Sequence, residues 1–510
     1  MSRPALVFIG FMGAGKTAAL VAAREAGLET TEVDDLMERA LEMPIKEAFE
    51  HHGEEAFRQR EAEIVGSLLE GADGGAIALG GGSVLSERVR EALDRHTVVW
   101  LRVDAEEAWR RIAHSDRPLA TSADDVARLM EAREPLYRQL ADVVLLSRER
   151  DQTARALPSA MALADLPQGA KMLWASSASG EYPVFVGPGL LDADCWPMTR
   201  RRFCVTDAAV GPLYAARAEP LEARVEVEPG ESAKSMAEAE RVLRELANAG
   251  MTREDLLIAL GGGVVGDLAG FCAHTYQRGV PIVQVPTSLV AQVDSAYGGK
   301  TGVDLPEGKN YVGAYHLPEA VIADTSTLVS LPREELVAGF VEVVKTGLLA
   351  GGDLWEQVRS IESLDPSHLD EIVFACAGYK CEVVAADERD TGLRAALNLG
   401  HTVGHAIEAA SGYKRYRHGE AVGLGLLSAL RLSEAPDLHD EVEAILSRHG
   451  LPVVLASEVD VDEVLSALQR DKKRTAEGVG FVLLSEPGEP RVGQILDPAK
   501  VRTAVEELRK

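Results

Sequence analysis

The chain has 510 residues, of which 46% are apolar and 26% are charged; these proportions are ordinary for a globular protein, and the length predicts about three domains. The formal net charge of −28 argues against a nucleic-acid-binding protein, because contacts to phosphate need a basic surface. The sequence has no uncharged apolar run of about 18 residues and no CxxC pair among its five cysteines, so we expect a cytoplasmic protein without a membrane span or a disulfide framework.

The first part of the chain alternates short apolar runs with charged helical patterns. Three runs predict buried strands, at residues 5–10, 76–79 and 98–103. Two patterns between them predict amphipathic helices, at residues 34–41 and 45–70. The alternation predicts an α/β domain with a parallel sheet and helices on both faces, which we place at residues 1–157. Residues 158–180 carry few charges and two prolines, and we expect them to form a linker.

A phosphate-binding motif directly follows the first predicted strand. The sequence GFMGAGKT, which ends at Thr17, fits the pattern G-x-x-x-x-G-K-[ST]. The backbone N–H groups of Gly13, Ala14 and Gly15 would converge on phosphate oxygens. Lys16 would reach the β- and γ-phosphates in a catalytic role, and Thr17 would offer its hydroxyl to Mg²⁺. The first domain is therefore predicted to bind ATP with Mg²⁺.

Residues downstream of this motif narrow the identity of the phosphate acceptor. In chain order they are Asp34, the segment GEEAFRQRE at 53–61, three glycines at 80–82, the Arg-Pro-Leu triplet at 117–119, and Arg133 before EPLY. In this order and spacing, residues 1–155 resemble shikimate kinase. The resemblance implies that shikimate is held by Asp34, Arg58, Gly81 and Arg133. It also implies two arginines for ATP, a catalytic Arg117 in the lid and Arg150.

One position departs from the pattern of that family. The family usually has two aspartates here, whereas this chain has Glu32 before Asp34. Glu32 is expected to contribute to the Mg²⁺ site through a water molecule. The alternative for this domain is another small-metabolite kinase of the same fold, such as a gluconate kinase. Arg58, Arg133 and the triple-glycine turn favour shikimate, a small carboxylate with hydroxyls.

A second α/β region and a helical region follow. Four apolar runs predict strands, at residues 182–186, 202–205, 256–260 and 282–285. Three segments predict helices, at residues 336–349, 369–386 and 402–410, and a late apolar run at 478–484 predicts a strand. The third of these runs, at 256–260, leads into three glycines and the start of a helix, which is typical of a backbone turn that approaches a phosphate. We place a Rossmann-like α/β domain at residues 181–335 and a mainly helical domain at 336–510.

Three side chains of the helical part have the composition of a catalytic metal site. Glu342, His401 and His418 offer one carboxylate and two imidazoles. Three protein ligands with one open position are typical of catalytic zinc. His401 and His405 are four residues apart, so they share one helix face. We therefore predict that Glu342, His401 and His418 bind Zn²⁺ or Co²⁺.

Several longer motifs surround these residues. They read GGGVVGD at 261–267, PTSLVAQVDSAYGGKTGVDLPEGKN at 286–310, GFVEVVKTGLL at 339–349, LNLGHTVGHAIE at 397–408, RHGEAVGLG at 417–425 and DKKR at 471–474. Together they make residues 180–510 resemble 3-dehydroquinate synthase. The resemblance implies an NAD- and metal-dependent conversion of 3-deoxy-D-arabino-heptulosonate 7-phosphate to 3-dehydroquinate and phosphate. In that reaction NAD is a catalyst and is not consumed.

The same resemblance assigns the residues of the second site. NAD would be held by Asp207, Glu231, Lys234, Gly262, Gly263, Val264, Asp267, Thr287, Ser288, Asp294, Lys300, Lys309, Thr327 and Leu328. The heptulosonate phosphate would be held by Arg278, Asn310, Lys345, Lys380, Arg394, Asn398, His405 and Lys473. Catalytic roles are implied for Lys345, His405, Lys300, Arg278 and Asp390. This chain departs from the family's motifs at three places, which bear on the affinity for the ligands. Ala209 stands where the family has Asn, Asp390 where it has Glu, and Ala296-Tyr297 where it has Ser-Val.

The leading hypothesis is a bifunctional enzyme of aromatic amino-acid biosynthesis that acts on small molecules, without nucleic-acid or membrane partners. A homodimer through the synthase half is compatible with the resemblance. One alternative for residues 180–510 is a sugar-phosphate cyclase that makes a valiolone or an inosose, and another is a metal-dependent polyol dehydrogenase. Lys380, Arg394 and Asn398 favour a substrate with a carboxylate, and the lysine-rich motifs favour one with a phosphate. A module that has lost catalysis is a third alternative, against which the intact motif residues argue.

Overall fold

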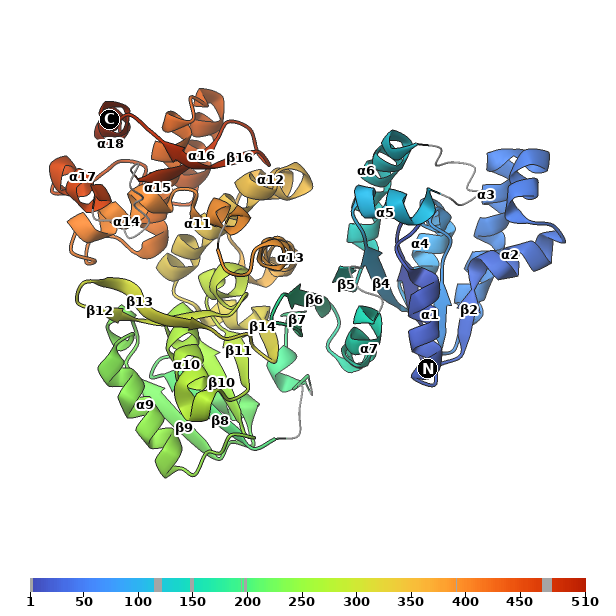
Figure 1. The fold of residues 1–510 in the computed structure, drawn as a ribbon, viewed down its shortest axis with the longest axis horizontal. Helices are drawn as coiled ribbons and strands as arrows, with labels where there is room; N and C mark the ends of the chain where they lie inside the picture. The colour runs from blue at the N-terminus through green and yellow to red at the C-terminus, as the bar shows by residue number, and fades with distance from the viewer. Residues whose placement is uncertain are drawn as a thin grey trace. The chain divides into compact units, whose positions relative to one another are not determined.

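The computed structural model describes residues 3–113, 122–146, 151–193, 195–196, 200–390, 392–469 and 479–510. The chain forms two compact units (Figure 1). Unit 1 comprises Met1–Ala175 and Pro183–Phe185, and unit 2 comprises Ser176–Tyr182 and Val186–Lys510. No helix among the described residues is long and apolar enough to cross a membrane.

Unit 1 is built on a parallel sheet in the strand order β2-β3-β1-β4-β5. The strands are β1 (Leu6–Ile9), β2 (Thr30–Glu32), β3 (Ala76–Ala78), β4 (Thr97–Arg102) and β5 (Val143–Leu146). The apolar runs predicted as strands form β1, β3 and β4, and every residue of β1 and β3 is buried. Strand β2 was not predicted, because its sequence TTE has no apolar residue.

Seven α-helices accompany this sheet in the described part of unit 1. They are α1 (Lys16–Glu25), α2 (Val33–Leu41), α3 (Ile45–Gly71), α4 (Glu87–Leu93), α5 (Ala105–Ile112), α6 (Ala123–Leu140) and α7 (Gln152–Ala162). The helices predicted at 34–41 and 45–70 are α2 and α3. The second of these has a break at Gly53, whose φ of 79° and ψ of 165° are not helical.

The segment expected to be a linker has regular structure. It contains the end of α7 and strand β6 (Lys171–Ser177), which extends the sheet by pairing in parallel with β5. Strand β7 (Gly180–Gly187) follows directly. The linker prediction was wrong about local structure, because MLWA in β6 is buried although the flanking residues are small and polar. The domain limits themselves stay a prediction.

Unit 2 begins with five parallel strands in the order β14-β11-β10-β8-β9. Its strands are β8 (Arg202–Asp207), β9 (Ala223–Val227), β10 (Leu256–Gly261), β11 (Ile282–Pro286) and β14 (Ala320–Asp324). The short helix α8 (Gly211–Tyr214), α9 (Met236–Asn248) and α10 (Gly263–Thr275) belong to this half. A fully buried cluster that includes Phe203, Leu246 and Leu268 packs α9 and α10 onto the sheet.

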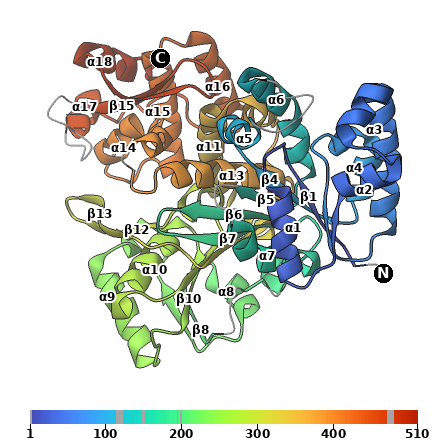
Figure 2. The same cartoon turned by 45° about the vertical axis from the view of Figure 1, so that its right-hand side comes forward.

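The second half of unit 2 is mainly helical, as predicted. Its helices are α11 (Arg333–Ala350), α12 (Gly352–Arg359), α13 (Asp370–Ala386), α14 (His401–Ala410), α15 (His418–Leu432), α16 (Pro436–Arg448), α17 (Val461–Gln469) and α18 (Pro498–Glu507). A hairpin of β15 (Gly480–Leu484) and β16 (Pro490–Ile495) includes the predicted late strand. The antiparallel hairpin of β12 (Lys300–Leu305) and β13 (Gly308–Tyr315) lies where the two halves of unit 2 meet (Figures 1 and 2).

Candidate active sites

The phosphate-binding motif forms the turn between β1 and α1. Gly15, with φ of 92°, is the residue before the first helical turn, and Lys16 opens α1. The left-handed backbone at this position favours glycine. The Lys16 ammonium donates to the carbonyl oxygens of Gly10 and Phe11, at 2.9 and 3.1 Å. The lysine therefore lies against the loop whose N–H groups face the phosphate position.

The predicted Mg²⁺ ligands lie together beside this loop. Glu32 precedes α2, and its carboxylate is hydrogen-bonded to the Thr17 side chain. Burial raises the pKa of Glu32, against the hydrogen bond from Thr17. The Glu32 oxygen Oε2 is buried without a hydrogen-bond partner. A hydroxyl and an unpaired carboxylate oxygen suit Mg²⁺, which prefers oxygen ligands, so these residues fit the ion.

The triple-glycine turn after β3 brings the predicted shikimate residues together. A methyl group on Gly82 would lie 2.4 Å from the Arg58 guanidinium, and one on Gly80 would lie 3.4 Å from Asp34 Oδ1. From α6, Arg133 Nη1 donates to Gly81 O at 3.3 Å. Glycines therefore leave space for two arginines and a carboxylate to surround one turn. This donor set matches an acid with several hydroxyls.

Sequence reasoning missed two residues that hold this turn. Glu61 is 4% exposed, accepts from Arg58 Nη1 at 2.6 Å and from Ser83 Oγ at 2.7 Å, and thereby fixes the arginine. The Tyr137 hydroxyl donates to Gly81 O at 2.5 Å. Glu61 lies three residues after Arg58, so helical spacing could have revealed it. The predicted ATP residues Arg117 and Arg150 lie outside the described residues.

The second site lies in unit 2, where helices α11, α14 and α15 present the predicted metal ligands. Glu342 Oε1 lies 3.5 Å from His401 Nε2 and 3.6 Å from His418 Nε2. Two ligands bound tetrahedrally at about 2.0–2.1 Å from zinc lie about 3.3–3.4 Å apart, so these spacings fit one ion. His405 faces the same point, since its ligating nitrogen lies within 4.8 Å of those of both other histidines.

Close backbone packing holds the two metal helices together. A methyl group on Gly425 of α15 would lie 1.9 Å from the carbonyl oxygen of Gly400, directly before α14. One on Gly419 would lie 1.9 Å from Ala338 O of α11. The glycines of RHGEAVGLG therefore allow α15 to approach both neighbours, which places His418 beside His401 and Glu342.

The charges of the metal group are strongly coupled. Burial raises the pKa of Glu342, but Lys345, His401 and His418 outweigh it and hold that pKa well below its usual range. Burial and Lys345 lower the pKa of His401. Burial also lowers the pKa of His418, but its hydrogen bonds to the Glu342 and Glu408 carboxylates, which accept from the imidazole, raise it to about 9. An ionised glutamate beside a neutral His401 is a donor set that suits zinc or cobalt.

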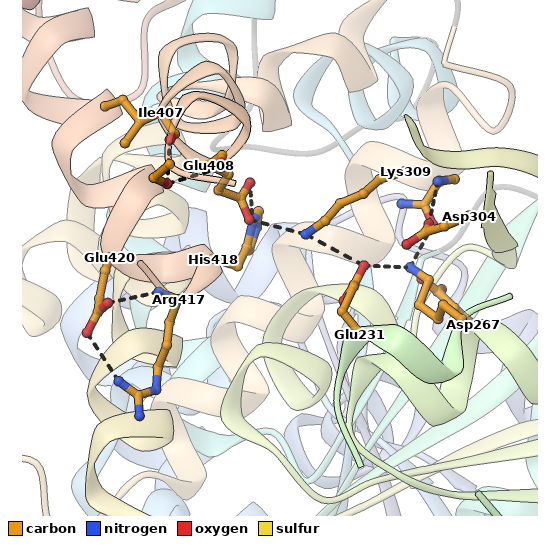
Figure 3. A network of polar contacts seen from close by, with 12 residues as sticks. Glu231, Asp267, Asp304, Lys309, Ile407, Glu408, Arg417, His418 and Glu420 are labelled. Carbon is orange, nitrogen blue, oxygen red and sulfur yellow. Dashed lines mark hydrogen bonds and ion pairs between the residues drawn. The ribbon is translucent and has the colours of Figure 1, made fainter. Parts of the chain in front are cut away.

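Glu408 is the residue that sequence reasoning missed at this site. It is 3% exposed, and its Oε2 lies 3.4 Å from His418 Nδ1 (Figure 3). Burial raises the pKa of Glu408, but His418 and Lys309 outweigh it and lower the pKa to about 2. Glu408 follows His401 by seven residues and His405 by three, so the helical period of the motif could have placed it on the same face.

The predicted NAD turn forms the junction of β10 and α10. Helix α10 begins at Gly263, and a methyl group there would lie 3.0 Å from Ser295 Oγ. One on Gly262 would lie 3.3 Å from Ser288 Oγ. Only glycine leaves this helix N-terminus open beside hydroxyl groups, which fits the close approach of a pyrophosphate. Val264 follows within the same turn.

A network of alternating charges borders this turn (Figure 3). Lys234 Nζ lies 2.8 Å from Asp267 Oδ2 and 2.6 Å from Asn310 Oδ1, and 3.6 Å from Glu231 Oε1. Lys309 Nζ lies 3.6 Å from the same glutamate oxygen. The structure thus brings five of the predicted ligand-binding residues of the α/β half together.

Four predicted NAD residues have other internal contacts. Asp207 accepts from the N–H groups of residues 209 and 210, at 2.9 and 2.8 Å. Thr287 is buried and donates its N–H to Gly261 O. The Thr327 hydroxyl donates to Asp324 O at 2.7 Å, and Leu328 is fully buried.

The predicted anion-binding residues form a buried cluster of cations. Lys345 is 1% exposed, forms an ion pair with Glu342, and lies 3.9 Å from Asp294 Oδ1. Lys380 Nζ lies 2.6 Å from the same aspartate oxygen. Arg394 is 2% exposed, and its Nε has no hydrogen-bond partner. The three cations of the cluster outnumber the two carboxylates paired with them, Glu342 and Asp294, which fits an anionic substrate.

The pKa values in this cluster follow burial and mutual charge. Burial raises the pKa of Asp294, but Lys380 and Lys345 outweigh it and lower the pKa to about 2. Burial and Lys345 lower the pKa of Lys380. Burial and Arg394 lower the pKa of Lys300, whose ammonium lies 2.5 Å from Asp390 Oδ2.

Four further residues were predicted to bind the substrate or to take part in catalysis: Asp390, Asn398, Arg278 and Lys473. Asp390 Oδ2 lies 2.5 Å from Lys300 Nζ, so the shorter side chain still reaches the lysine, whereas its Oδ1 is buried without a hydrogen-bond partner. The Asn398 amide donates to Ala395 O at 2.9 Å. Arg278 is exposed, and no ion pair among the described residues joins it to the cluster. Lys473 lies outside the described residues.

Comparisons with known proteins identify the families to which the two parts of the chain are similar. Family models match residues 224–338 as the N-terminal part of 3-dehydroquinate synthase, residues 339–474 as its C-terminal part, and residues 12–162 as shikimate kinase. Among solved structures, a 2-epi-5-epi-valiolone synthase from Streptomyces hygroscopicus with NAD⁺ and Zn²⁺ bound has a TM-score of 0.56 at 25% identity, covering 64% of this chain and 96% of its own. A 2-deoxy-scyllo-inosose synthase shares the fold, with a TM-score of 0.59 at 23% identity over 66% of this chain and 99% of its own. Unit 2 thus has the fold of NAD- and metal-dependent sugar-phosphate cyclases.

Curated relatives give the family. The 3-dehydroquinate synthase of Symbiobacterium thermophilum is 45% identical over 64% of this chain and 98% of its own. That of Azotobacter vinelandii is 43% identical over 60% of this chain and 89% of its own. The chain belongs to the 3-dehydroquinate synthase family and carries a shikimate kinase domain at its N-terminal end. It is an enzyme whose domains indicate two activities of the shikimate pathway.

Proposed function

We propose that unit 1 transfers the γ-phosphoryl group of ATP to the 3-hydroxyl of shikimate, and that unit 2 converts 3-deoxy-D-arabino-heptulosonate 7-phosphate to 3-dehydroquinate and phosphate. The observation that carries the second assignment is the position of Lys345. Its ammonium pairs with Glu342, which faces both metal histidines, and it also faces Asp294 beside Lys380. Metal ligands and anion-binding cations thus share one buried site.

In unit 1, the residues bind and orient two substrates. Lys16 and the N-terminus of α1 would hold the phosphates of ATP, while Thr17 and Glu32 would hold Mg²⁺. Arg58 and Arg133 would bind the carboxylate of shikimate and Asp34 would accept from its hydroxyls. Glu61 fixes the Arg58 guanidinium, so that arginine is ordered before shikimate binds.

In unit 2, bound NAD⁺ supplies reversible oxidation of the substrate alcohol, and Zn²⁺ or Co²⁺ supplies Lewis-acid polarisation of it. Glu342, His401 and His418 would hold the metal. Lys345, Lys380 and Arg394 would neutralise the phosphate and the carboxylate of the substrate. His405 lies beside the metal ligands and would exchange a proton with a substrate hydroxyl.

The remaining proposals concern the setting of both reactions. We propose that both reactions act on small molecules in the cytoplasm without membrane partners, and the net charge of −28 argues against a nucleic-acid partner. Among the cyclases, Lys380 and Arg394 favour a substrate with a carboxylate in addition to its phosphate over a hexose phosphate without a carboxylate. A homodimer through the synthase half is part of the proposal.

The test is an assay of the purified chain with each substrate alone. Shikimate with ATP and Mg²⁺ should give ADP. The heptulosonate phosphate should release phosphate in the presence of NAD⁺ and Zn²⁺, without accumulation of NADH. Stoichiometric NADH without phosphate would mean a dehydrogenase, and turnover of a hexose phosphate without a carboxylate would mean another cyclase.

A further inference from the structure

We propose that Glu408 is a positioning residue that couples the metal and NAD sites of unit 2. Its two carboxylate oxygens make separate contacts, one with the metal histidine His418 and one with Lys309 of the β12–β13 hairpin (Figure 3). The inference rests on the proposed metal and NAD sites and goes beyond them, because it gives a role to a residue that is neither a ligand nor a group in contact with substrate.

On the metal side, Glu408 fixes the imidazole of His418. The oxygen Oε2 lies 3.4 Å from Nδ1, whereas Nε2 of the same ring lies 3.6 Å from Glu342 Oε1. A carboxylate that accepts from Nδ1–H leaves the lone pair of Nε2 free and aimed at the metal position. Removal of such a partner typically weakens metal binding tenfold to a hundredfold.

On the NAD side, the second oxygen of Glu408 holds the hairpin. Lys309 Nζ lies 3.2 Å from Oε1 of Glu408 and 3.6 Å from Oε1 of Glu231. The ammonium also lies 4.9 Å from the centre of the Tyr413 ring, in the loop after α14. Glu231 continues the chain of charges to Lys234. One buried carboxylate thus joins the metal helix α14 to the strand that carries Lys309 and Asn310.

The consequence is a reciprocal effect of the two ligands. When NAD⁺ holds the hairpin, Lys309 stays on Glu408, and Glu408 in turn holds His418 in its metal-binding orientation. We therefore expect NAD⁺ to tighten Zn²⁺ binding, and by linkage Zn²⁺ must tighten NAD⁺ binding by the same factor. The expected factor is about fivefold or more, at the lower end of typical coupling.

The experiment measures the Zn²⁺ dissociation constant of the full chain by competition with a chromophoric chelator, with and without saturating NAD⁺. Glu408→Gln keeps the size of the side chain and removes its charge. Its Zn²⁺ affinity should fall tenfold to a hundredfold and should no longer respond to NAD⁺. The visible spectrum of bound Co²⁺ should change, since the orientation of His418 changes. Glu408→Asp keeps the charge, so it should partly restore the Zn²⁺ affinity and its response to NAD⁺.

The control is Glu420→Gln on the same helix as His418. Its carboxylate accepts from the backbone N–H of Arg417 at 2.8 Å and pairs with that side chain, away from the imidazole (Figure 3). This variant should bind Zn²⁺ like the unaltered chain and respond to NAD⁺ equally. Lys309→Met removes the other end of this contact: at an NAD⁺ concentration shown by titration to saturate the variant, its Zn²⁺ affinity should no longer respond to NAD⁺, which tests the coupling even if Glu408→Gln does not fold.

Two results would overturn the inference. One is a Zn²⁺ affinity of Glu408→Gln equal to that of the unaltered chain, and the other is an unchanged NAD⁺ response in either Glu408→Gln or Lys309→Met. Failure of the proposed function is distinguishable, because the unaltered chain would then bind no Zn²⁺ or no NAD⁺ at all.

Discussion

Single residues in the second site show how buried charges are kept in place. Lys345 and Lys380 are almost fully buried, and a buried ammonium is costly unless it is paired. Asp294 lies between them and serves as a shared partner. The aspartate therefore has a structural task as well as a place in the predicted ligand site, and its removal should be visible in stability.

Asp294→Asn should lower the free energy of unfolding at pH 7 by about 2 kcal/mol, because the folded carboxyl has a pKa of about 2 against an ordinary value near 4. A lowered pKa stabilises the fold above the unfolded value, and this contribution is lost as the pH falls through about 2. The difference in free energy of unfolding between the unaltered chain and Asp294→Asn should therefore have its full value at pH 5 and should decrease below pH 4. Urea unfolding of unit 2 measures it, with the exposed Asp353→Asn as control.

Arg394→Ala should reduce kcat/KM for the heptulosonate phosphate about tenfold to over a hundredfold, since a hydrogen bond to a charged group contributes about 1.5–3 kcal/mol. The guanidinium is 2% exposed with an unpaired Nε, which leaves a donor for the substrate. Steady-state phosphate release is the measurement. The control is Arg389, whose guanidinium lies over the Tyr315 ring. Arg389→Ala should have nearly the same kcat/KM as the unaltered chain. Equal losses in both variants would contradict a specific role for Arg394.

At the scale of elements, the site depends on how closely helices approach each other. Helices α14 and α15 carry the two metal histidines, and glycines at their crossing remove the side chains that would separate them. Such contacts leave no room for relaxation, because both partners are backbone. A single methyl group at the crossing should therefore act on the metal site from a distance.

Gly425→Ala should destabilise unit 2 by about 3 kcal/mol or more and weaken Zn²⁺ binding, because the added methyl would meet Gly400 O at 1.9 Å. Gly423→Ala lies on the same helix, and its methyl would find its nearest neighbour, a Leu446 side-chain carbon, at 3.6 Å. Since alanine favours helix, this control should be as stable as the unaltered chain or about 1 kcal/mol more stable. Thermal unfolding and Zn²⁺ competition measure both. Equal stability and equal Zn²⁺ affinity of Gly425→Ala and Gly423→Ala would contradict the claim that the close helix crossing at Gly425 holds the metal site together.

Elements with a strong apolar pattern could be predicted from the sequence, and those without it could not. The apolar runs near 256–260 and 282–285 became β10 and β11, and the predicted helix at 402–410 became α14, which starts one residue earlier. Strand β13 was missed because GKNYVGAY is polar and partly exposed, so it has no buried face to reveal it. The ligand types could be named from motifs, but the contacts of Glu408 with Lys309 and Glu61 with Ser83 join distant segments, which spacing cannot show.

At the scale of the whole molecule, the chain divides into two compact units, each with its own set of parallel strands and its own candidate site. The phosphate-binding loop lies wholly in unit 1, and the metal and cation clusters lie wholly in unit 2. The two proposed reactions share no substrate or product. Nothing in either site therefore requires the chemistry of the other.

Lys16→Ala should slow phosphorylation of shikimate a hundredfold or more and leave phosphate release from the heptulosonate phosphate nearly unchanged. The lysine opens α1 beside the loop that faces the phosphates, and loss of one preorganised charge contact typically costs a hundredfold to a thousandfold in rate. Assays of ADP formation and phosphate release on the same preparation measure both activities. Lys46→Ala, an exposed lysine of α3 in the same unit, should keep both. If Lys16→Ala stayed folded but lost both activities, the two units would have to act as one catalytic system, because a lysine confined to the first site can reach the second reaction only through such coupling.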